Sequence, residues 1–209
     1  MPSEALVHVI DDDEAVRTSM EFLLRSARID VRTYESAVAF LKALPDIKSG
    51  CIVTDVRMPE MSGIDLLRRL RELGNEIPVI VVTGHGEVPL AVEAMKIGAI
   101  DFLEKPFDDD VLLTSVRGAL DRLAADSRRE AERGELQDRL ETLSQREREV
   151  LDGLIAGNPN KTIAYDLGIS PRTVEIYRAN VMTKMKASSL SELVRMALLA
   201  GLLGASERP

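Results

Sequence analysis

Five short apolar runs alternate with helical patterns over the first 105 residues, and this alternation constrains the fold most. The runs are continuously apolar, which is typical of strands that are buried on both faces of a parallel sheet. Helical patterns separate them at about 14–27, 36–44, 63–73 and 89–97, and another begins at Asp109. We therefore predict an α/β domain with a doubly wound parallel sheet, whose strands lie at 6–10, 31–34, 51–54, 79–82 and 100–103.

Polar side chains follow four of these runs at their carboxyl ends. The acids Asp11, Asp12 and Asp13 follow the first run, Asp55 closes the third, Thr83 closes the fourth and Lys105 follows the fifth. Ligands of open α/β sheets bind at this edge, so these side chains should converge there. Carboxylates alone would repel a phosphoryl donor, whereas Mg²⁺ bridges carboxylate and phosphate oxygens. The set therefore predicts a site for a divalent metal and a phosphoryl group, with Asp13 as a solvated acid at the start of a helix.

The remaining reactive side chains have simpler interpretations. His8 lies in the middle of an expected strand and His85 lies in a glycine-rich loop, and neither is expected to act as a phosphodonor. The single cysteine, Cys51, falls inside an expected strand, which favours a core role in a reducing compartment. No apolar stretch approaches the roughly 20 residues that span a bilayer, and no signal peptide is evident. We expect a cytoplasmic protein that binds no membrane.

The pattern changes after residue 120. Residues 121–142 are rich in interleaved charge and in good helix formers, interrupted only by Gly134, which indicates a solvated helical linker that continues the preceding helix. A partly disordered tether is the alternative, and a coiled coil is disfavoured because no apolar heptad is sustained. The expected divisions are an α/β domain at 1–120, this linker at 121–142 and a second domain at 143–209.

The second domain shows four helical segments and no strands. Ser-x-x-Glu capping boxes begin helices at Ser144 and Ser189. Between them, a short helix over 161–167 stops at Gly168, and Ser170-Pro171 opens a helix that runs to about residue 185. This order is typical of a helix-turn-helix. The last apolar helix, which should end near Gly204, either packs on its own domain or forms a dimer contact.

Charge also divides the chain. Residues 1–120 hold 13 Lys and Arg against 21 Asp and Glu, whereas residues 144–209 hold 9 against 7. In the helix after Pro171, the positions Val174, Tyr177, Val181 and Met185 recur at helical spacing and should be core. Glu175 is unusual, because an acid near DNA tolerates few contacts, such as a cytosine amine. The expected DNA contacts are Lys161, Arg172, Thr173, Glu175, Ile176, Arg178, Ala179, Asn180, Lys184 and Lys186.

Several strings resemble a known family. Residues 1–120, with Asp55-Val-Arg-Met-Pro, Thr83-Gly-His-Gly-Glu-Val-Pro and Phe102-Leu-Glu-Lys-Pro-Phe, resemble the flavodoxin-like receiver domain of two-component response regulators. Residues 144–205 resemble the four-helix DNA-binding domain of the LuxR/FixJ class. The strings are most similar to those of the nitrogen-fixation members of that class.

The resemblance implies a role for each site residue. Asp55 would accept the phosphoryl group, Lys105 would pair with it, and Thr83 would donate a hydrogen bond to it and form a switch with Phe102. The Lys105–Pro106 bond would be cis. The expected ligands of Mg²⁺ (or Mn²⁺) are Asp11, Asp12, Asp55 and the main-chain carbonyl of Arg57.

The same resemblance implies the partners. A sensor histidine kinase, here FixL-like and oxygen-sensing, would phosphorylate the chain, which would then dimerise, bind promoter DNA and activate transcription by RNA polymerase in a low-oxygen nitrogen-fixation circuit. Helix 89–97 carries two apolar stripes, and a surface helix needs only one. The stripe Val88, Val92 and Met95 is therefore the expected dimer face, unless both faces of this helix are packed.

Two other functions compete with this one. A Mg²⁺-dependent phosphatase of the haloacid-dehalogenase type carries a second acid two residues after its nucleophile, but Arg57 occupies that position here. We therefore do not expect an enzyme. A DNA-binding regulator that needs no phosphate, and whose first domain only mediates assembly, stays as the alternative.

Overall fold

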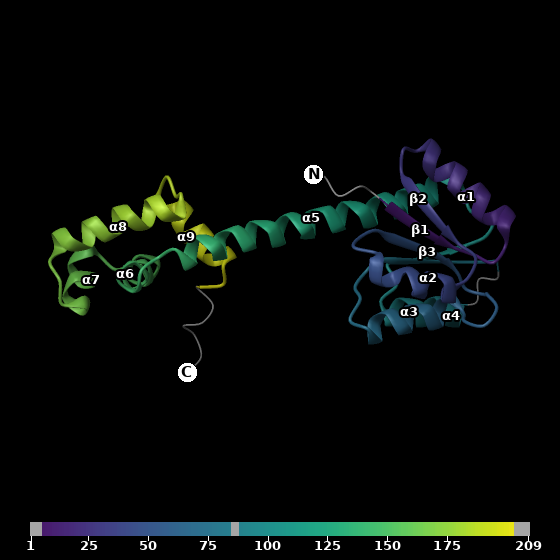
Figure 1. The fold of residues 1–209 in the computed structure, drawn as a ribbon, viewed down its shortest axis with the longest axis horizontal. Coiled ribbons are helices and arrows are strands. Elements are labelled where there is room, and N and C mark those ends of the chain that lie inside the picture. Colours follow the sequence, from purple (N-terminus) through teal and green to yellow (C-terminus); the bar gives the residue numbers. More distant parts are fainter. Residues whose placement is uncertain (1–5, 85–87, 203–209) are drawn as a thin grey trace. The chain divides into compact units, whose positions relative to one another are not determined.

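The computed structural model describes residues 6–84 and 88–202, and the chain divides into two compact units between Asp126 and Ser127 (Figure 1). His85, Gly86 and Glu87, in the middle of the string Thr83-Gly-His-Gly-Glu-Val-Pro, lie outside the described residues. Within the described ranges, no helix is both long and apolar enough to cross a membrane.

The first unit is built on a five-stranded parallel sheet with the order β2-β1-β3-β4-β5. Its strands are β1 (Leu6–Ile10), β2 (Asp30–Tyr34), β3 (Cys51–Asp55), β4 (Val79–Thr83) and β5 (Asp101–Glu104). The helices that connect and follow them are α1 (Glu14–Ser26), α2 (Ala37–Ala43), the 3₁₀ turn η1 (Leu44–Asp46), α3 (Gly63–Glu72), α4 (Val88–Ile97) and α5 (Asp109–Glu141). The predicted doubly wound sheet is confirmed, with strand bounds that differ by one residue or less.

Each face of the sheet has its own core. Alternate strand residues such as Val7 and Val9 pack with α1 and the first part of α5, and residues such as Ile52 and Val81 pack with α2, α3 and α4. Because both faces are covered, β3 and β4 are buried along most of their length, whereas the edge strand β2 exposes Asp30, Arg32 and Thr33. The acids and the lysine of interest lie at the carboxyl ends of the strands.

The second unit consists of helices around a separate core. They are α6 (Gln145–Ile155), α7 (Asn160–Leu167), α8 (Pro171–Met185) and α9 (Leu190–Leu199), preceded by the end of α5. Leu136, Leu140 and Leu143 are buried in this core. The linker is helical, as predicted, but the prediction that it is solvated throughout is wrong, because its last two turns contribute leucines to the second unit.

Two helices of the second unit begin at capping serines, Ser144 and Ser189. Ser144 and Glu147 form the predicted reciprocal capping box. The second predicted box is only half formed: the Ser189 side chain accepts from the Glu192 backbone, but the Glu192 carboxylate bonds Ser188 instead of the Ser189 backbone. The hydroxyl and backbone N–H of Ser188, one residue earlier, both reach this carboxylate, which accounts for the difference.

Candidate functional site

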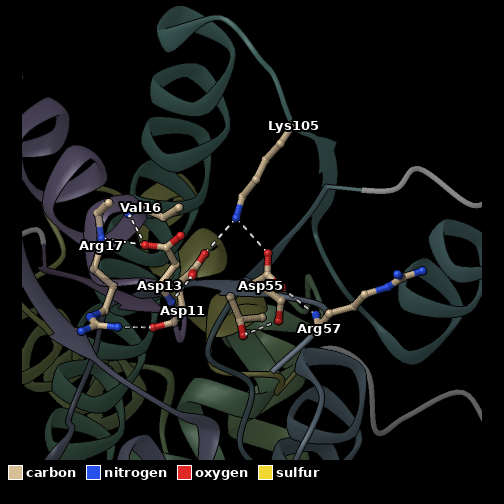
Figure 2. A network of polar contacts seen from close by, with 9 residues as sticks. Asp11, Asp13, Val16, Arg17, Asp55, Arg57 and Lys105 are labelled. Atoms are coloured by element: carbon tan, nitrogen blue, oxygen red, sulfur yellow. Dashed lines mark hydrogen bonds and ion pairs between the residues drawn. The ribbon is translucent and has the colours of Figure 1, made fainter. Parts of the chain in front are cut away.

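The carboxyl ends of three strands bring two acids and a lysine together (Figure 2). Asp11 follows β1, Asp55 ends β3 and Lys105 follows β5. The Lys105 Nζ lies 2.8 Å from Asp11 Oδ2 and 2.8 Å from Asp55 Oδ1, so one ammonium bridges both carboxylates. Thr83, at the end of β4 between β3 and β5, is buried at the same edge.

The backbone around Asp55 fixes its side chain. The Arg57 backbone N–H donates to Asp55 Oδ2 at 2.6 Å, which leaves Oδ1 for Lys105. Gly63, the first residue of α3, packs against the Asp55 carbonyl, and a Cβ on this glycine would lie 2.1 Å from that oxygen. A larger residue at position 63 would therefore displace the end of β3 and the carboxylate that it carries.

Lys105 is held in its charged form. Its burial alone would lower its pKa, but the hydrogen bonds and charges of Asp11 and Asp55 outweigh this effect and raise the pKa of Lys105 above its usual value. A permanent ammonium between two carboxylates screens their mutual repulsion. The same group is positioned to meet a phosphoryl group attached to Asp55.

The three acids after β1 lie in different environments. Asp13 caps α1, as expected for a helix-start acid, because its Oδ1 accepts from Ala15 N at 2.8 Å. Asp11 Oδ1 accepts from the Asp13 backbone, and Asp12 is exposed beside it. A role for Arg17 was not predicted: its guanidinium donates to the Asp11 carbonyl at 2.7 Å and holds this loop.

This donor set suits Mg²⁺ more than a metal that needs a cage. Among residues 6–84 and 88–202, no three acid, histidine or cysteine side chains are grouped so as to enclose an ion. Mg²⁺ usually takes one or two protein carboxylates and completes its shell with water and phosphate oxygens. Asp12 and Asp55 could supply that partial shell, with Asp11 assisting, because both side-chain oxygens of Asp11 already accept hydrogen bonds.

The second apolar stripe of α4 is exposed. Val88, Val92 and Met95 are 74%, 46% and 49% exposed, whereas Ala94 is fully buried and Leu90 packs on the core. The alternative of a helix packed on both faces is therefore wrong. Phe102 of β5 is partly buried. It packs on the same core as Ala94 and Leu90, beside Val81 of β4.

Helix α8 presents one outward face. Its inner positions Val174, Val181 and Met185 are buried and Tyr177 is partly buried, as predicted. The exposed positions recur at spacings of three and one along the helix, which is the geometry of a single stripe. They are Arg172, Glu175, Ile176, Ala179 and Asn180, while the predicted contact Thr173 is half-buried beside them.

The predicted cations differ in how free they are. Lys161, Arg172 and Lys186 are exposed. The Arg178 guanidinium instead donates to Asn160 Oδ1 at 3.4 Å, and Lys184 Nζ lies 2.6 Å from Glu147 Oε2. Lys184 thus has a structural partner that the sequence did not reveal, since 37 residues separate the two and only the fold brings them together.

Two family models match the chain. A response regulator receiver domain matches residues 7–117, and the luxR family of bacterial regulatory proteins matches residues 141–197. The transcriptional regulatory protein FixJ of Azorhizobium caulinodans is 61% identical over 207 residues, covering 99% of this chain and 98% of that protein. This chain belongs to the FixJ-like response regulators. The FixJ of Rhizobium meliloti is 55% identical and covers 93% of this chain and 96% of that protein.

Solved structures agree with this membership. The crystal structure of full-length FixJ from B. japonicum is 52% identical, with a TM-score of 0.61, over 96% of this chain and 98% of that one. The response regulator StyR is 41% identical, with a TM-score of 0.80, over 94% and 99%.

Membership establishes the function in outline. A FixJ-like response regulator with a LuxR-type domain is a DNA-binding regulator of transcription, and neither family is an enzyme family. Its receiver implies a histidine kinase as partner, and receivers generally bind Mg²⁺ at the phosphorylation site. The conclusion that the chain is not an enzyme thus rests on its families, in agreement with the prediction from Arg57.

Proposed function

We propose that a sensor histidine kinase phosphorylates Asp55, that the receiver then dimerises through α4, and that the second unit binds and activates promoters. The observation that carries this proposal is the bridge from Lys105 to Asp11 and Asp55 at the carboxyl edge of the sheet. It supplies an ionised nucleophile, a fixed positive charge and a partial metal shell in one place.

The chemistry follows from the positions of these groups. An Asp55 oxygen forms the new bond to phosphorus while the bond from phosphorus to the donor's nitrogen or oxygen breaks, and the electron pair leaves with the donor. Lys105 pairs with the transferred oxygens, and Thr83 donates its hydroxyl to them. Asp12, Asp55 and the Arg57 carbonyl would hold Mg²⁺, with Asp11 assisting, and the metal would supply positive charge for these oxygens.

The dimer face is proposed from exposure. Three large apolar side chains of α4, at Val88, Val92 and Met95, face solvent in the described unit, which is costly unless a partner covers them. Thr83 ends β4 and Phe102 lies on β5, the strands before and after α4 in the chain. These two residues therefore form the proposed switch between the phosphoryl group and α4.

The DNA contacts are proposed on the outward stripe of α8. A recognition helix reads bases from the major groove, while basic side chains contact phosphates. Lys161, Arg172 and Lys186 are exposed and serve the second role in this proposal. Lys184 and Arg178 contact DNA only if they leave Glu147 and Asn160, so we rank them after the others.

The cellular setting is proposed from the relatives. The FixJ proteins are named as transcriptional regulatory proteins, and their likeness supports nitrogen-fixation genes under low oxygen as targets, with a FixL-like kinase and RNA polymerase as partners. A regulator that binds promoter DNA works in the compartment that holds the DNA, which supports the cytoplasm.

The decisive experiment is the intact mass of the full chain after incubation with Mg²⁺ and acetyl phosphate. Wild type should gain one phosphoryl group, and Asp55→Asn should gain none. Glu60→Gln, on the same loop but outside the site, is the matched control and should be labelled like wild type. Equal labelling of wild type and Asp55→Asn would refute Asp55 as the acceptor.

Dimerisation is tested on the same samples by light scattering. Phosphorylated wild type should double in mass, and Val92→Glu should stay a monomer while it is still phosphorylated. If Asp55→Asn binds and activates promoters as well as wild type, the alternative regulator that needs no phosphate is correct.

A further inference from the structure

Glu175 is an unpaired acid in the middle of the outward stripe of α8. It is exposed, and its carboxylate makes no hydrogen bond or ion pair with any residue in 6–84 or 88–202. Arg172 lies one turn before it and Arg178 one turn after it, yet Arg178 bonds Asn160 instead. Among the described residues, nothing engages the Glu175 carboxylate, so it is available to a bound partner.

An acid on a DNA-binding face is costly unless it meets a donor. Phosphates surround the groove with negative charge, so an unpaired carboxylate there reduces affinity for every sequence. The major groove presents two base donors, cytosine N4 and adenine N6. Adenine N6 lies beside the N7 acceptor, which repels a carboxylate, whereas the cytosine edge presents its amine without that neighbour.

The next residue adds a different preference. Ile176 is 57% exposed and lies about 100° further around the helix, so it faces an adjoining position of the groove. An exposed branched apolar side chain gains from the methyl group of thymine. Glu175 and Ile176 thus form a pair that reads one amine and one methyl group.

We propose that Glu175 determines specificity by accepting a hydrogen bond from cytosine N4 at one C·G pair of each half-site, next to a T·A pair contacted by Ile176. The proposal rests on the proposed DNA contacts of α8. In this role Glu175 lowers the affinity for other sequences, because a thymine or guanine at the same position would place an acceptor atom against the carboxylate.

The test is selection of binding sites from a random duplex pool by the phosphorylated full chain. Wild type should enrich a motif with a C at one position per half-site, preferred about tenfold or more over other bases. Glu175→Ala should bind a wider set with no preference at that position. Glu175→Gln should change the preference there to adenine, because an amide donates to N7 and accepts from N6.

The controls distinguish the proposed DNA contacts of α8 from the specific role of Glu175. Glu149→Gln, which changes a half-buried acid on α6 that pairs with Arg146, should enrich the wild-type motif unchanged. Retained binding of the Glu175 variants to the pooled DNA at low salt shows that they fold. If wild type enriches no sequence, the proposed DNA contacts of α8 fail; if Glu175→Ala enriches the same motif as wild type, only the role of Glu175 is overturned.

Discussion

Glu147→Gln should destabilise the second unit, because it removes the charge from a carboxylate that holds two helices together. Glu147 is 4% exposed, and its Oε2 accepts from Lys184 Nζ at 2.6 Å, from Ser144 N at 2.8 Å and from Ser144 Oγ at 2.9 Å. The contact joins the start of α6 to the end of α8. The amide keeps the shape of the side chain but loses the ionic hydrogen bond.

The magnitude follows from the pKa of this carboxyl. The hydrogen bond from Lys184, followed by that from the Ser144 backbone, lowers the pKa of Glu147 from 4.5 to about 2. Fully expressed, this shift corresponds to about 3 kcal/mol of unfolding free energy. The Lys184 side chain is 38% exposed, so solvent screening reduces the effect, and we expect a loss of about 1–2 kcal/mol.

The pH dependence has a definite sign. Because the folded-state pKa is lowered, the stabilisation is fully present above pH 4.5 and is lost as the pH falls towards 2. The difference in unfolding free energy between wild type and Glu147→Gln should therefore shrink across this window.

Hydrogen exchange measured by mass spectrometry is the suitable assay, since peptides of the two units are read separately. Peptides from α6 and α8 should exchange about 5- to 30-fold faster in Glu147→Gln at neutral pH, and those from the β-sheet should not change. Glu149→Gln is the matched control: it breaks an exposed pair with Arg146 on the same helix, which contributes little. Equal exchange in the two variants would refute the structural role of the buried pair.

Four further substitutions test particular contacts. Gly63→Ala should abolish phosphorylation by acetyl phosphate, measured by intact mass, because its Cβ would displace the acceptor's backbone; normal labelling would contradict this. Gly153→Ala should lower the unfolding free energy by about 1–3 kcal/mol, because its Cβ would lie 2.7 Å from Ile163 Cγ1, whereas Gly134→Ala meets nothing within 4 Å and should stabilise α5 by about 1 kcal/mol. Urea unfolding distinguishes this pair, and equal effects would show the packing to be wrong. Leu140→Ala should cost about 2–5 kcal/mol by the same measurement, and a loss under 1 kcal/mol would mean that the linker's end is not core.

The sheet and its polar edge could be predicted because their signals are local. The central strands β3 and β4 are nearly continuous apolar runs, and parallel pairing places the residues that follow the strands at one edge. Asp11, Asp55 and Lys105 were therefore expected together, although up to 94 residues separate them. The exposed stripe of α4 was likewise visible, because two apolar stripes at helical spacing exceed what one core contact needs.

Tertiary partners of charged residues could not be predicted in the same way. Lys184 was interpreted as a phosphate contact because the sequence records its charge and not its neighbours. The leucines at 136 and 140 were interpreted as part of a solvated linker because the surrounding residues are charged. Their four-residue spacing, continued by Leu143, is the one signal that indicated a buried stripe.

The charges around Lys105 indicate that this lysine alone would not neutralise a phosphoryl group on Asp55. One ammonium already serves two carboxylates, each at 2.8 Å. A phosphoryl group on Asp55 would raise the negative charge at this edge by about one unit, because a phosphate group carries about −1.5 to −2 at neutral pH. Lys105 cannot meet this added charge without weakening its bond to Asp11, so the excess must be met by a divalent cation and by neutral donors such as the Thr83 hydroxyl. In the proposed switch, phosphorylation of Asp55 would therefore draw on Thr83, at the end of β4, and this demand would let the Thr83 hydroxyl report the phosphoryl group to the rest of the receiver.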